Sequence, residues 1–290
     1  MEKTNKFSNL KRVDFKNKIT ILAYLFKKGL KIKPSLREIN CYEYYNILIQ
    51  NNGYLAQETN QFYISNFNDL QIKKIKTRKR PSSDIDVFKQ VYGWNEYLEV
   101  IKLYKQNFKP IENISLNIVD AGSNIGLTSL YFTDYFKNAI IIAIEPEIEN
   151  FKILDFNLSD KKYNKINGAI WKNNGYIKIV KDFRDKLDWS FRVEETHDKN
   201  AITAFTINQI MIDYNYKTID ILKIDVEGSE KEIFTSKDSN LDFLKNTKCI
   251  AIEIHDEFNC RQDIYKVLTD YGFSFSETGE TTIGINKNLI

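Results

Sequence analysis

The pattern of apolar and polar residues changes near residue 115. Beyond this point, short apolar runs alternate with segments whose apolar residues recur every three or four positions. Such runs are typical of buried strands, and the segments between them are typical of amphipathic helices. The predicted strands are 116–120, 139–145, 165–170, 219–225 and 249–255, and the predicted helices are 125–135, 147–158, 207–215, 229–234 and 261–271.

These elements predict an α/β fold. Strands that are apolar on both sides and separated by helices form a parallel sheet with helices on both faces. At the end of the chain, residues 273–275 and 282–285 pair around the turn Thr278-Gly279-Glu280. We therefore predict a doubly wound, mostly parallel sheet with an antiparallel C-terminal strand.

The part before the sheet has a different character. The predicted organisation is a basic segment at 1–40, an N-terminal α+β appendage at 41–110 and a ligand-binding domain at 111–290. In the basic segment, a predicted helix at 16–33 places Ile19, Leu22, Leu25 and Phe26 on one face among many lysines. Such a helix either makes weak contact with an anionic membrane surface or packs on the protein with its lysines in water. The pattern leaves both interpretations open.

Composition narrows the function classes. With 42% hydrophobic and 13% aromatic residues, the chain of 290 residues can bury a substantial core. Its net charge of +3 gives no field that calls for a nucleic-acid partner. The cysteines at 41, 249 and 260 lack CxxC spacing, which favours a reducing compartment over a disulfide framework or a zinc site. No apolar run near the start reaches the roughly 20 residues that span a bilayer, so we expect a cytoplasmic protein.

The first strand of the sheet ends in the loop DAGSNIG, residues 120–126. Gly122 and Gly126 permit close backbone approach, and the helix that follows favours an anionic group at its N-terminus. Glu145 ends the second strand, nineteen residues after Gly126. A carboxylate at this spacing can accept hydrogen bonds from both hydroxyls of a ribose. The loop and Glu145 together predict a ligand with an adenosine part.

Two kinds of ligand share these features. A dinucleotide fingerprint reads GxGxxG, but here Asp120 precedes the first glycine and Asn124 stands where a glycine is expected. A carboxylate aimed at the loop repels a pyrophosphate and attracts an ammonium group. S-adenosylmethionine offers an ammonium for Asp120 and a carboxylate for the loop amides, so the electrostatics favour it. A NAD-type oxidoreductase or a sugar-nucleotide enzyme is the alternative.

Acidic residues and a histidine follow the last two parallel strands. Asp225 ends the fourth strand and Glu227 follows it, while the fifth strand ends in AIEIH, where alternation puts Glu253 and His255 on one face. Methyl transfer to a hydroxyl needs a group that takes up the proton as the new bond forms. Asp225, Glu227 and His255 are the candidates. Asp225, Glu227 and Glu253 also suit a divalent metal such as magnesium, but their spacing specifies none.

The order of these motifs resembles one family. VDAGSNIG, AIEPEIENFKILDFN, NGAIW, IDILKIDVEGSE and AIEIH follow one another as in the FkbM-type S-adenosylmethionine-dependent methyltransferases. The segment RPSSDIDVFKQVYGWNEY, residues 80–97, resembles the family's entry segment, so the resemblance covers about residues 75–275. It implies a class I methyltransferase (Rossmann-like) fold and transfer of a methyl group to a hydroxyl, in sugars of glycans or in natural products.

The resemblance also implies roles for individual residues. The residues implied to contact the methionine part of the cofactor are Asp120, Gly122, Ser123, Asn124 and Gly126. Glu145 would hold the ribose, and Ala169 and Ile170 would border the adenine. Asp225 and Glu227 would lie near the transferred methyl group.

Overall fold

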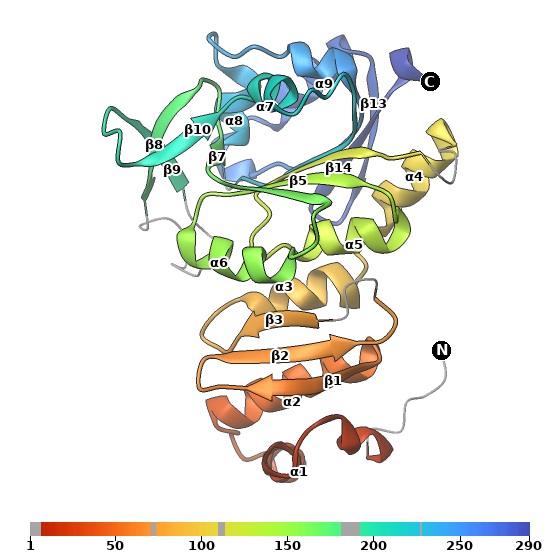
Figure 1. Ribbon diagram of the computed structural model, residues 1–290, viewed down its shortest axis with the longest axis vertical. Coiled ribbons are helices and arrows are strands. Elements are labelled where there is room, and N and C mark those ends of the chain that lie inside the picture. Colours follow the sequence, from red (N-terminus) through yellow and green to blue (C-terminus); the bar gives the residue numbers. More distant parts are fainter. Residues whose placement is uncertain (1–6, 71–73, 110–113, 181–191, 227) are drawn as a thin grey trace. The chain divides into compact units, whose positions relative to one another are not determined.

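The computed structural model describes residues 7–70, 74–109, 114–180, 192–226 and 228–290 (Figure 1). The chain forms two compact units, Met1–Asn95 and Glu96–Ile290. The first unit carries one small antiparallel sheet, and the second carries a large sheet and a small one.

The first unit is built from helices and a three-stranded sheet of order β1-β2-β3. Helix α1 packs on α2, which packs on β1. Ser35 caps the N-terminus of α2, because its hydroxyl accepts a hydrogen bond from Glu38 N–H while the Glu38 carboxylate accepts one from Ser35 N–H. The elements are a 3-10 helix (Ser8–Arg12), α1 (Phe15–Gly29), α2 (Leu36–Gln50), β1 (Gly53–Glu58), β2 (Phe62–Phe67), β3 (Lys74–Arg78), α3 (Asp84–Phe88) and a π-helical turn (Lys89–Gly93).

The large sheet of the second unit has seven strands in the order β13-β14-β12-β11-β4-β5-β6. Strand β14 runs antiparallel to both of its neighbours, and the pairs from β12 to β6 are parallel. This confirms the predicted mostly parallel sheet with an antiparallel strand at the C-terminal end. The strands are β4 (Asn117–Ala121), β5 (Ile140–Glu145), β6 (Tyr163–Asn167), β11 (Ile219–Ile224), β12 (Thr247–Glu253), β13 (Phe273–Thr278) and β14 (Thr281–Asn286).

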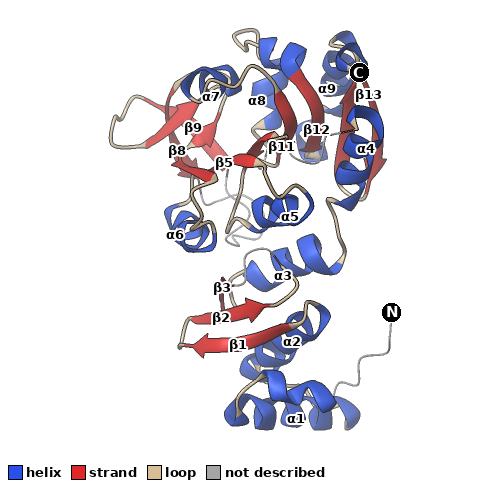
Figure 2. Ribbon diagram, turned by 45° about the vertical axis from the view of Figure 1, so that its right-hand side comes forward, coloured by secondary structure: helices blue, strands red, loops and turns tan. Residues whose placement is uncertain are grey.

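Helices cover both faces of this sheet, as Figure 2 shows: α5 and α6 lie on one side, and α7, α8 and α9 lie on the other. All six residues of β11 are buried, the two charged residues Asp220 and Lys223 as well as the four isoleucines and leucines. The helices are α4 (Leu98–Phe108), α5 (Leu127–Tyr135), α6 (Ile148–Asn157), α7 (Ile207–Asp213), α8 (Glu230–Thr235) and α9 (Arg261–Asp270), with 3-10 turns at Asp242–Asn246, Asp256–Phe258 and Lys287–Leu289.

The predicted strand at 165–170 is wrong in one respect, because the chain leaves the large sheet at Gly168. A Cβ atom at this position would lie 2.9 Å from the Thr203 carbonyl oxygen. The strand that contains Thr203 can therefore approach this closely only because residue 168 is glycine. The residues after it form a second sheet of order β7-β10-β8-β9 that the apolar pattern did not predict. Its strands are β7 (Ala169–Ile170), β8 (Gly175–Val180), β9 (Arg192–Thr196) and β10 (Ile202–Phe205).

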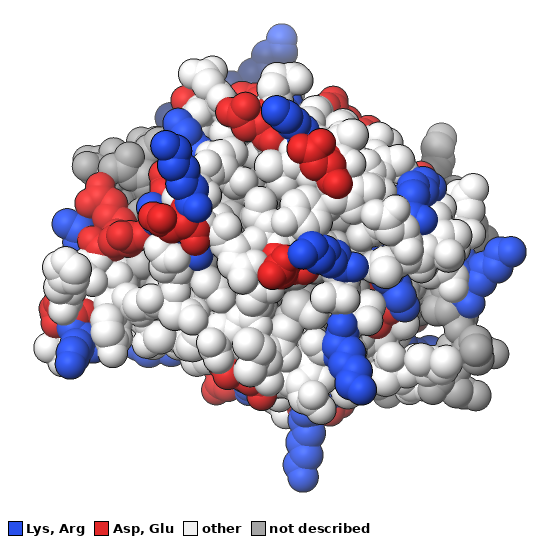
Figure 3. Space-filling model, turned by 90° about the horizontal axis from the view of Figure 1, so that it is seen from above, with Lys and Arg blue, Asp and Glu red and all other residues white. Residues whose placement is uncertain are grey.

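Two general properties bear on function. Among the described residues, no helix is long and apolar enough to cross a membrane. On the face drawn in Figure 3, basic and acidic side chains are interspersed, and neither sign forms a large continuous area.

Candidate functional site

Four parallel strands bring the predicted site residues to one edge of the large sheet. The carboxyl ends of β4 and β5 carry the glycine loop and Glu145, and those of β11 and β12 carry Asp225 and Glu253. Neighbouring parallel strands end on the same side of a sheet, which is where open α/β folds bind ligands. Residues separated by more than a hundred positions therefore meet there.

The glycine loop is fixed by close packing against the end of β11. Gly122 has φ +79°, and a Cβ at this position would lie 1.7 Å from the carbonyl oxygen of Asp225. Gly126 has φ +84° and directly precedes α5. The N–H groups of Gly122 and Ser123 both donate to the Ile144 carbonyl, at 3.0 and 2.9 Å. These two amides therefore hold the loop to β5.

Ser123 joins β4 to β5 through its side chain. Its hydroxyl donates to the Asp120 carbonyl at 2.6 Å and accepts from Ile144 N–H at 3.0 Å. The residue is 3% exposed. In this arrangement Ser123 shapes the loop, and its implied contact with the cofactor stays a prediction.

Asn124 and Glu145 are linked directly. The N–H of Asn124, which has φ +49°, donates to Glu145 Oε2 at 2.8 Å. The other Glu145 oxygen accepts from Glu147 N–H at 2.9 Å. Burial, opposed by these hydrogen bonds, raises the pKa of Glu145 to about 7. Among the described residues, nothing hydrogen-bonds to the buried Oδ1 of Asn124, so this oxygen is available to a ligand donor.

Lys223 lies at this edge, and the sequence interpretation missed it. Its Nζ donates to the Gly122 carbonyl at 2.6 Å and lies 3.3 Å from Asp225 Oδ2 and 3.6 Å from Asp120 Oδ1. Asp120 is fully buried, and its Oδ2 accepts from the Ser129 hydroxyl at 2.6 Å. Asp120 is predicted to attract a ligand ammonium, and in the structure the ammonium of Lys223 lies beside its carboxylate.

The charge of Lys223 is held by its surroundings. Burial alone lowers the pKa of this side chain, but Asp225, Tyr97 and Asp120 together outweigh burial and raise it. One signal in the sequence pointed to such a role: a lysine in the middle of an apolar strand needs buried partners. Lys223 is thus a cation that ties the loop after β4 to the end of β11.

Asp225, Glu253 and His255 form the second part of the site. One donor atom of each lies within 4.8 Å of those of the other two. His255 follows β12 rather than lying within it, yet its Nε2 is 3.6 Å from Glu253 Oε1. The set offers two carboxylates and an imidazole, which can accept a proton and can also serve as ligands of a divalent cation.

A buried carboxylate lies behind His255. Glu230 is fully buried at the start of α8, and its Oε1 lies 3.2 Å from His255 Nδ1. The same oxygen accepts from Val226 N–H at 3.1 Å. A proton on Nδ1 directed at this carboxylate leaves Nε2 as the basic nitrogen. This contact fixes the orientation of the imidazole.

The remaining predicted residues lie at the side of the site or outside the described residues. Ala169 and Ile170 form β7, next to β5, and are 5% and 2% exposed. Glu227 lies outside the described residues, so its implied role stays a prediction. Glu96, which the sequence interpretation did not single out, is half-buried, and burial followed by the charge of Asp225 raises its pKa.

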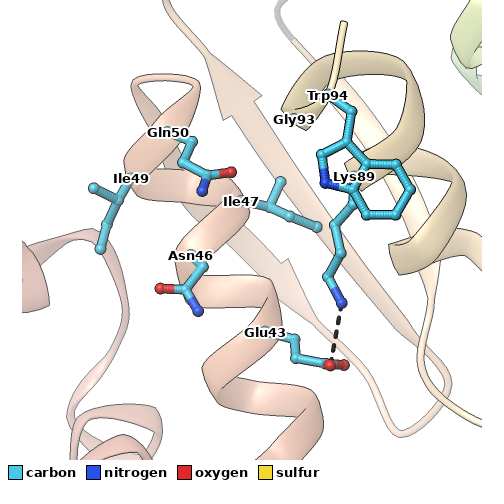
Figure 4. Close-up of a pocket in the computed structure, with 8 residues that line it drawn as sticks. All are labelled: Glu43, Asn46, Ile47, Ile49, Gln50, Lys89, Gly93 and Trp94. Atoms are coloured by element: carbon cyan, nitrogen blue, oxygen red, sulfur yellow. Dashed lines mark ion pairs between the residues drawn. The ribbon is translucent and has the colours of Figure 1, made fainter. Parts of the chain in front are cut away.

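The first unit has a pocket of its own, shown in Figure 4. Its lining comes from α2 and from the segment around the π-helical turn, with a 3.1 Å ion pair between Lys89 and Glu43. Trp94 stands at the pocket with 74% of its surface exposed. None of the predicted site residues lines this pocket.

Comparison with known proteins places the site in context. The profile of the methyltransferase FkbM domain matches residues 120–275, more than half of the chain. Methyltransferase sdnD of Sordaria araneosa is 26% identical over 220 residues, and the match covers 62% of this chain and 84% of that protein. The match to the FkbM profile begins at Asp120 and includes every predicted site residue.

Solved structures resemble the chain more distantly. A precorrin-6y C5,15-methyltransferase from Geobacter metallireducens has a TM-score of 0.36 at 12% identity, covering 64% of this chain and 88% of the other. Human methyltransferase-like protein 13, in complex with S-adenosylhomocysteine, has a TM-score of 0.36 at 11% identity, covering 66% and 80%. These similarities are low, and the strand order described above carries the assignment of the fold.

Proposed function

The chain belongs to the FkbM methyltransferase family and is an S-adenosylmethionine-dependent methyltransferase, and we propose that it methylates a hydroxyl group, with His255 as the general base. The observation that carries this proposal is the imidazole of His255 beside Asp225 and Glu253 at the carboxyl ends of β11 and β12. The family does not favour the alternative of a NAD-type oxidoreductase or a sugar-nucleotide enzyme.

The residues at this edge fit the cofactor. The orphan Oδ1 of Asn124 can accept from an ammonium, and the Glu145 oxygens retain lone pairs for ribose hydroxyls. Gly122 has no Cβ, so the loop backbone packs directly against the Asp225 carbonyl and the loop stays fixed at this edge. When bound, S-adenosylmethionine supplies an electrophilic methyl group on a positively charged sulfur. The Asp225 and Glu253 carboxylates provide negative charge suited to that neighbourhood.

The geometry is consistent with a separate task for each of His255, Asp225 and Glu253 in the proposed reaction. A hydroxyl must lose its proton as it attacks, and the Nε2 of His255 is the basic atom facing the site when Glu230 holds Nδ1–H. The carboxylates of Asp225 and Glu253 accept hydrogen bonds from hydroxyl groups of the substrate and orient the oxygen that receives the methyl group. Positioning of this kind contributes to rate because the reacting groups need no search for alignment.

We further propose that the acceptor is a sugar of a glycan or of a natural-product precursor, as the family resemblance implies. Several carboxylates at the site support this, because vicinal sugar hydroxyls donate well to carboxylate oxygens. Glu96 adds a further carboxyl group near Asp225: burial, and after it the charges of Asp225 and Glu280, raise the pKa of Glu96. A polyhydroxylated acceptor can use more of these oxygens than a simple alcohol.

The test is a methyl-transfer assay with labelled cofactor and a panel of sugars and polyols, read by mass spectrometry. The chain has two histidines, so His255→Gln and His197→Gln form a matched pair. We expect His255→Gln to lower kcat by about 10²- to 10⁴-fold while S-adenosylhomocysteine still binds, and His197→Gln to leave kcat unchanged. Full activity of His255→Gln would reject His255 as the base, and methylation confined to nitrogen would reject a hydroxyl acceptor.

A further inference from the structure

Helix α1 has an apolar stripe that points into solvent. Phe15, Ile19, Leu22 and Phe26 are spaced four, three and four residues apart, which at 3.6 residues per turn places them within a sector roughly 60° wide. They are 75%, 54%, 44% and 68% exposed. Leu30, directly after the helix, extends the stripe and is 56% exposed. We call these five residues the α1 stripe.

The opposite side of α1 holds the helix in its unit. Ile21 is fully buried, and the side-chain amide of Asn17 donates to Glu58 Oε2 of β1 at 2.7 Å. Tyr24 stacks on Tyr42 of α2, with ring centroids 4.2 Å apart. The helix is therefore already docked by a different face, and the α1 stripe is not needed for that packing.

Exposed apolar side chains are common singly but uncommon in groups on soluble proteins. Of the fifteen large hydrophobic residues that are exposed among the described residues, eight lie between Phe7 and Leu36. This concentration within one segment marks it as a contact surface.

The charge of the same segment indicates the partner. Residues 7–37 contain nine lysines and arginines and a single acid, Asp14, whose carboxylate caps α1. The rest of the chain contains 33 basic and 38 acidic residues, so its net charge is negative. Lys16, one residue after Phe15, and Lys31, one residue after Leu30, are exposed beside the α1 stripe. Apolar side chains flanked by cations match a surface that is apolar inside and anionic outside.

We propose that the α1 stripe docks the protein on an anionic lipid surface. Phe15, Ile19, Leu22 and Phe26 enter the boundary between headgroups and acyl chains, and the surrounding lysines contact anionic headgroups. A second copy of this chain is a poorer partner, because docking stripe to stripe brings two sets of like charges together. This surface is independent of the catalytic site and of the acceptor.

Sedimentation of the full-length protein with vesicles tests the proposal. We expect binding to mixed phosphatidylcholine–phosphatidylglycerol vesicles, weakening as salt rises, and little binding to phosphatidylcholine alone. Phe15→Ser with Phe26→Ser should weaken partition about ten-fold or more, and Lys16→Glu with Lys31→Glu should also weaken it about ten-fold or more. Ile212→Ser is the matched control, because Ile212 of α7 is 71% exposed but lies in the second unit.

Three results would overturn the proposal. The first is no binding of the wild type to the anionic vesicles, and the second is equal binding of the wild type and the double Phe variant. The third is a lipid-free dimer, seen by light scattering, that the double Phe variant converts to a monomer. Circular dichroism spectra and melting temperatures that match the wild type would show that the variants, changed only at exposed positions, are folded.

Discussion

At the scale of single residues, Lys223 connects the two halves of the site. It contacts the Gly122 carbonyl after β4 and Asp225 after β11, and its ammonium faces the fully buried Asp120. A buried carboxylate is stable only when it is paired and hydrogen-bonded. Lys223 therefore stabilises the loop and places a positive charge beside Asp225, at the proposed site of methyl transfer.

Replacing this lysine tests that role. We expect Lys223→Met to lower the free energy of unfolding by about 3–5 kcal/mol, because it leaves the buried carboxylate of Asp120 without a counter-charge. Lys248→Met is the control, since Lys248 also pairs with an acid, Asp220, but its side chain is 31% exposed. Urea denaturation measures both. Losses of equal size would contradict the special role of Lys223.

Glu230 is a positioning residue in the proposed mechanism, because it acts through His255. We expect Glu230→Gln to lower kcat by about ten-fold or more without changing S-adenosylhomocysteine affinity, as a base in the wrong tautomer cannot take up the proton. The ¹⁵N shifts of the imidazole should show the proton on Nδ1 of His255 in the wild type and a mixture in the variant. His197 serves as the internal reference, and an unchanged His255 spectrum would contradict this role.

Glu145 makes stability depend on pH. Its pKa is raised from 4.5 to about 7 in the folded chain, so the folded state binds the proton more tightly than the unfolded state. The stabilisation is fully present below pH 4.5 and is lost as pH rises through about 7. We expect a loss of about 3 kcal/mol from this group over that window, measured by urea denaturation at a series of pH values. Glu145→Gln should make the free energy of unfolding less dependent on pH in this range. An unchanged dependence would show that Glu145 is not the group responsible.

At the scale of elements, the loop between β4 and α5 shapes the proposed cofactor site. We expect Gly122→Ala to lower the free energy of unfolding by about 3 kcal/mol or more and to abolish binding of S-adenosylhomocysteine, since its Cβ would overlap the Asp225 carbonyl. Gly175→Ala is the control, because a Cβ at Gly175 meets nothing within 4 Å. Calorimetric titration and denaturation measure both effects. Equal stability and equal S-adenosylhomocysteine binding of the two variants would contradict the close contact between Gly122 and the Asp225 carbonyl.

At this scale, the apolar pattern predicts some strands correctly and fails to predict others. The buried strand β11 and the hairpin of β13 and β14 lie where the apolar runs predict them. Strand β7 does not continue β6, because Gly168 lets β10 approach closely. A packing constraint of this kind comes from a segment more than thirty residues away, and hydrophobic periodicity carries no information about it.

At the scale of the whole molecule, the site combines charges of both signs. Lys223 already compensates Asp225, so we expect methyl transfer to persist after treatment with EDTA. Inactivation that Mg²⁺ or Mn²⁺ restores would instead assign a metal to Asp225, Glu253 and His255, whose donors suit such ions. The assay should include S-adenosylhomocysteine binding with and without Mg²⁺, to separate cofactor affinity from turnover.

The sequence by itself determined the kind of fold and the family. Apolar runs and their spacing specify a parallel sheet with helices, because burial on both faces requires apolar residues throughout a strand. The motifs at the ends of those strands, from Asp120 to His255, identified the methyltransferase. These features are local in the chain, and their order along it was enough to identify the kind of fold and the family.

The tertiary structure decided which charged residues face one another. Lys223 meets Asp120, and Glu230 meets His255, across 103 and 25 positions of sequence, as only strand order and helix packing can arrange. It also decided which side of α1 is buried, because Ile21 packs inward while Phe15 and Phe26 stay in solvent. A pattern of apolar residues shows that a helix has an apolar face, but only the packing of its neighbours determines whether that face is covered.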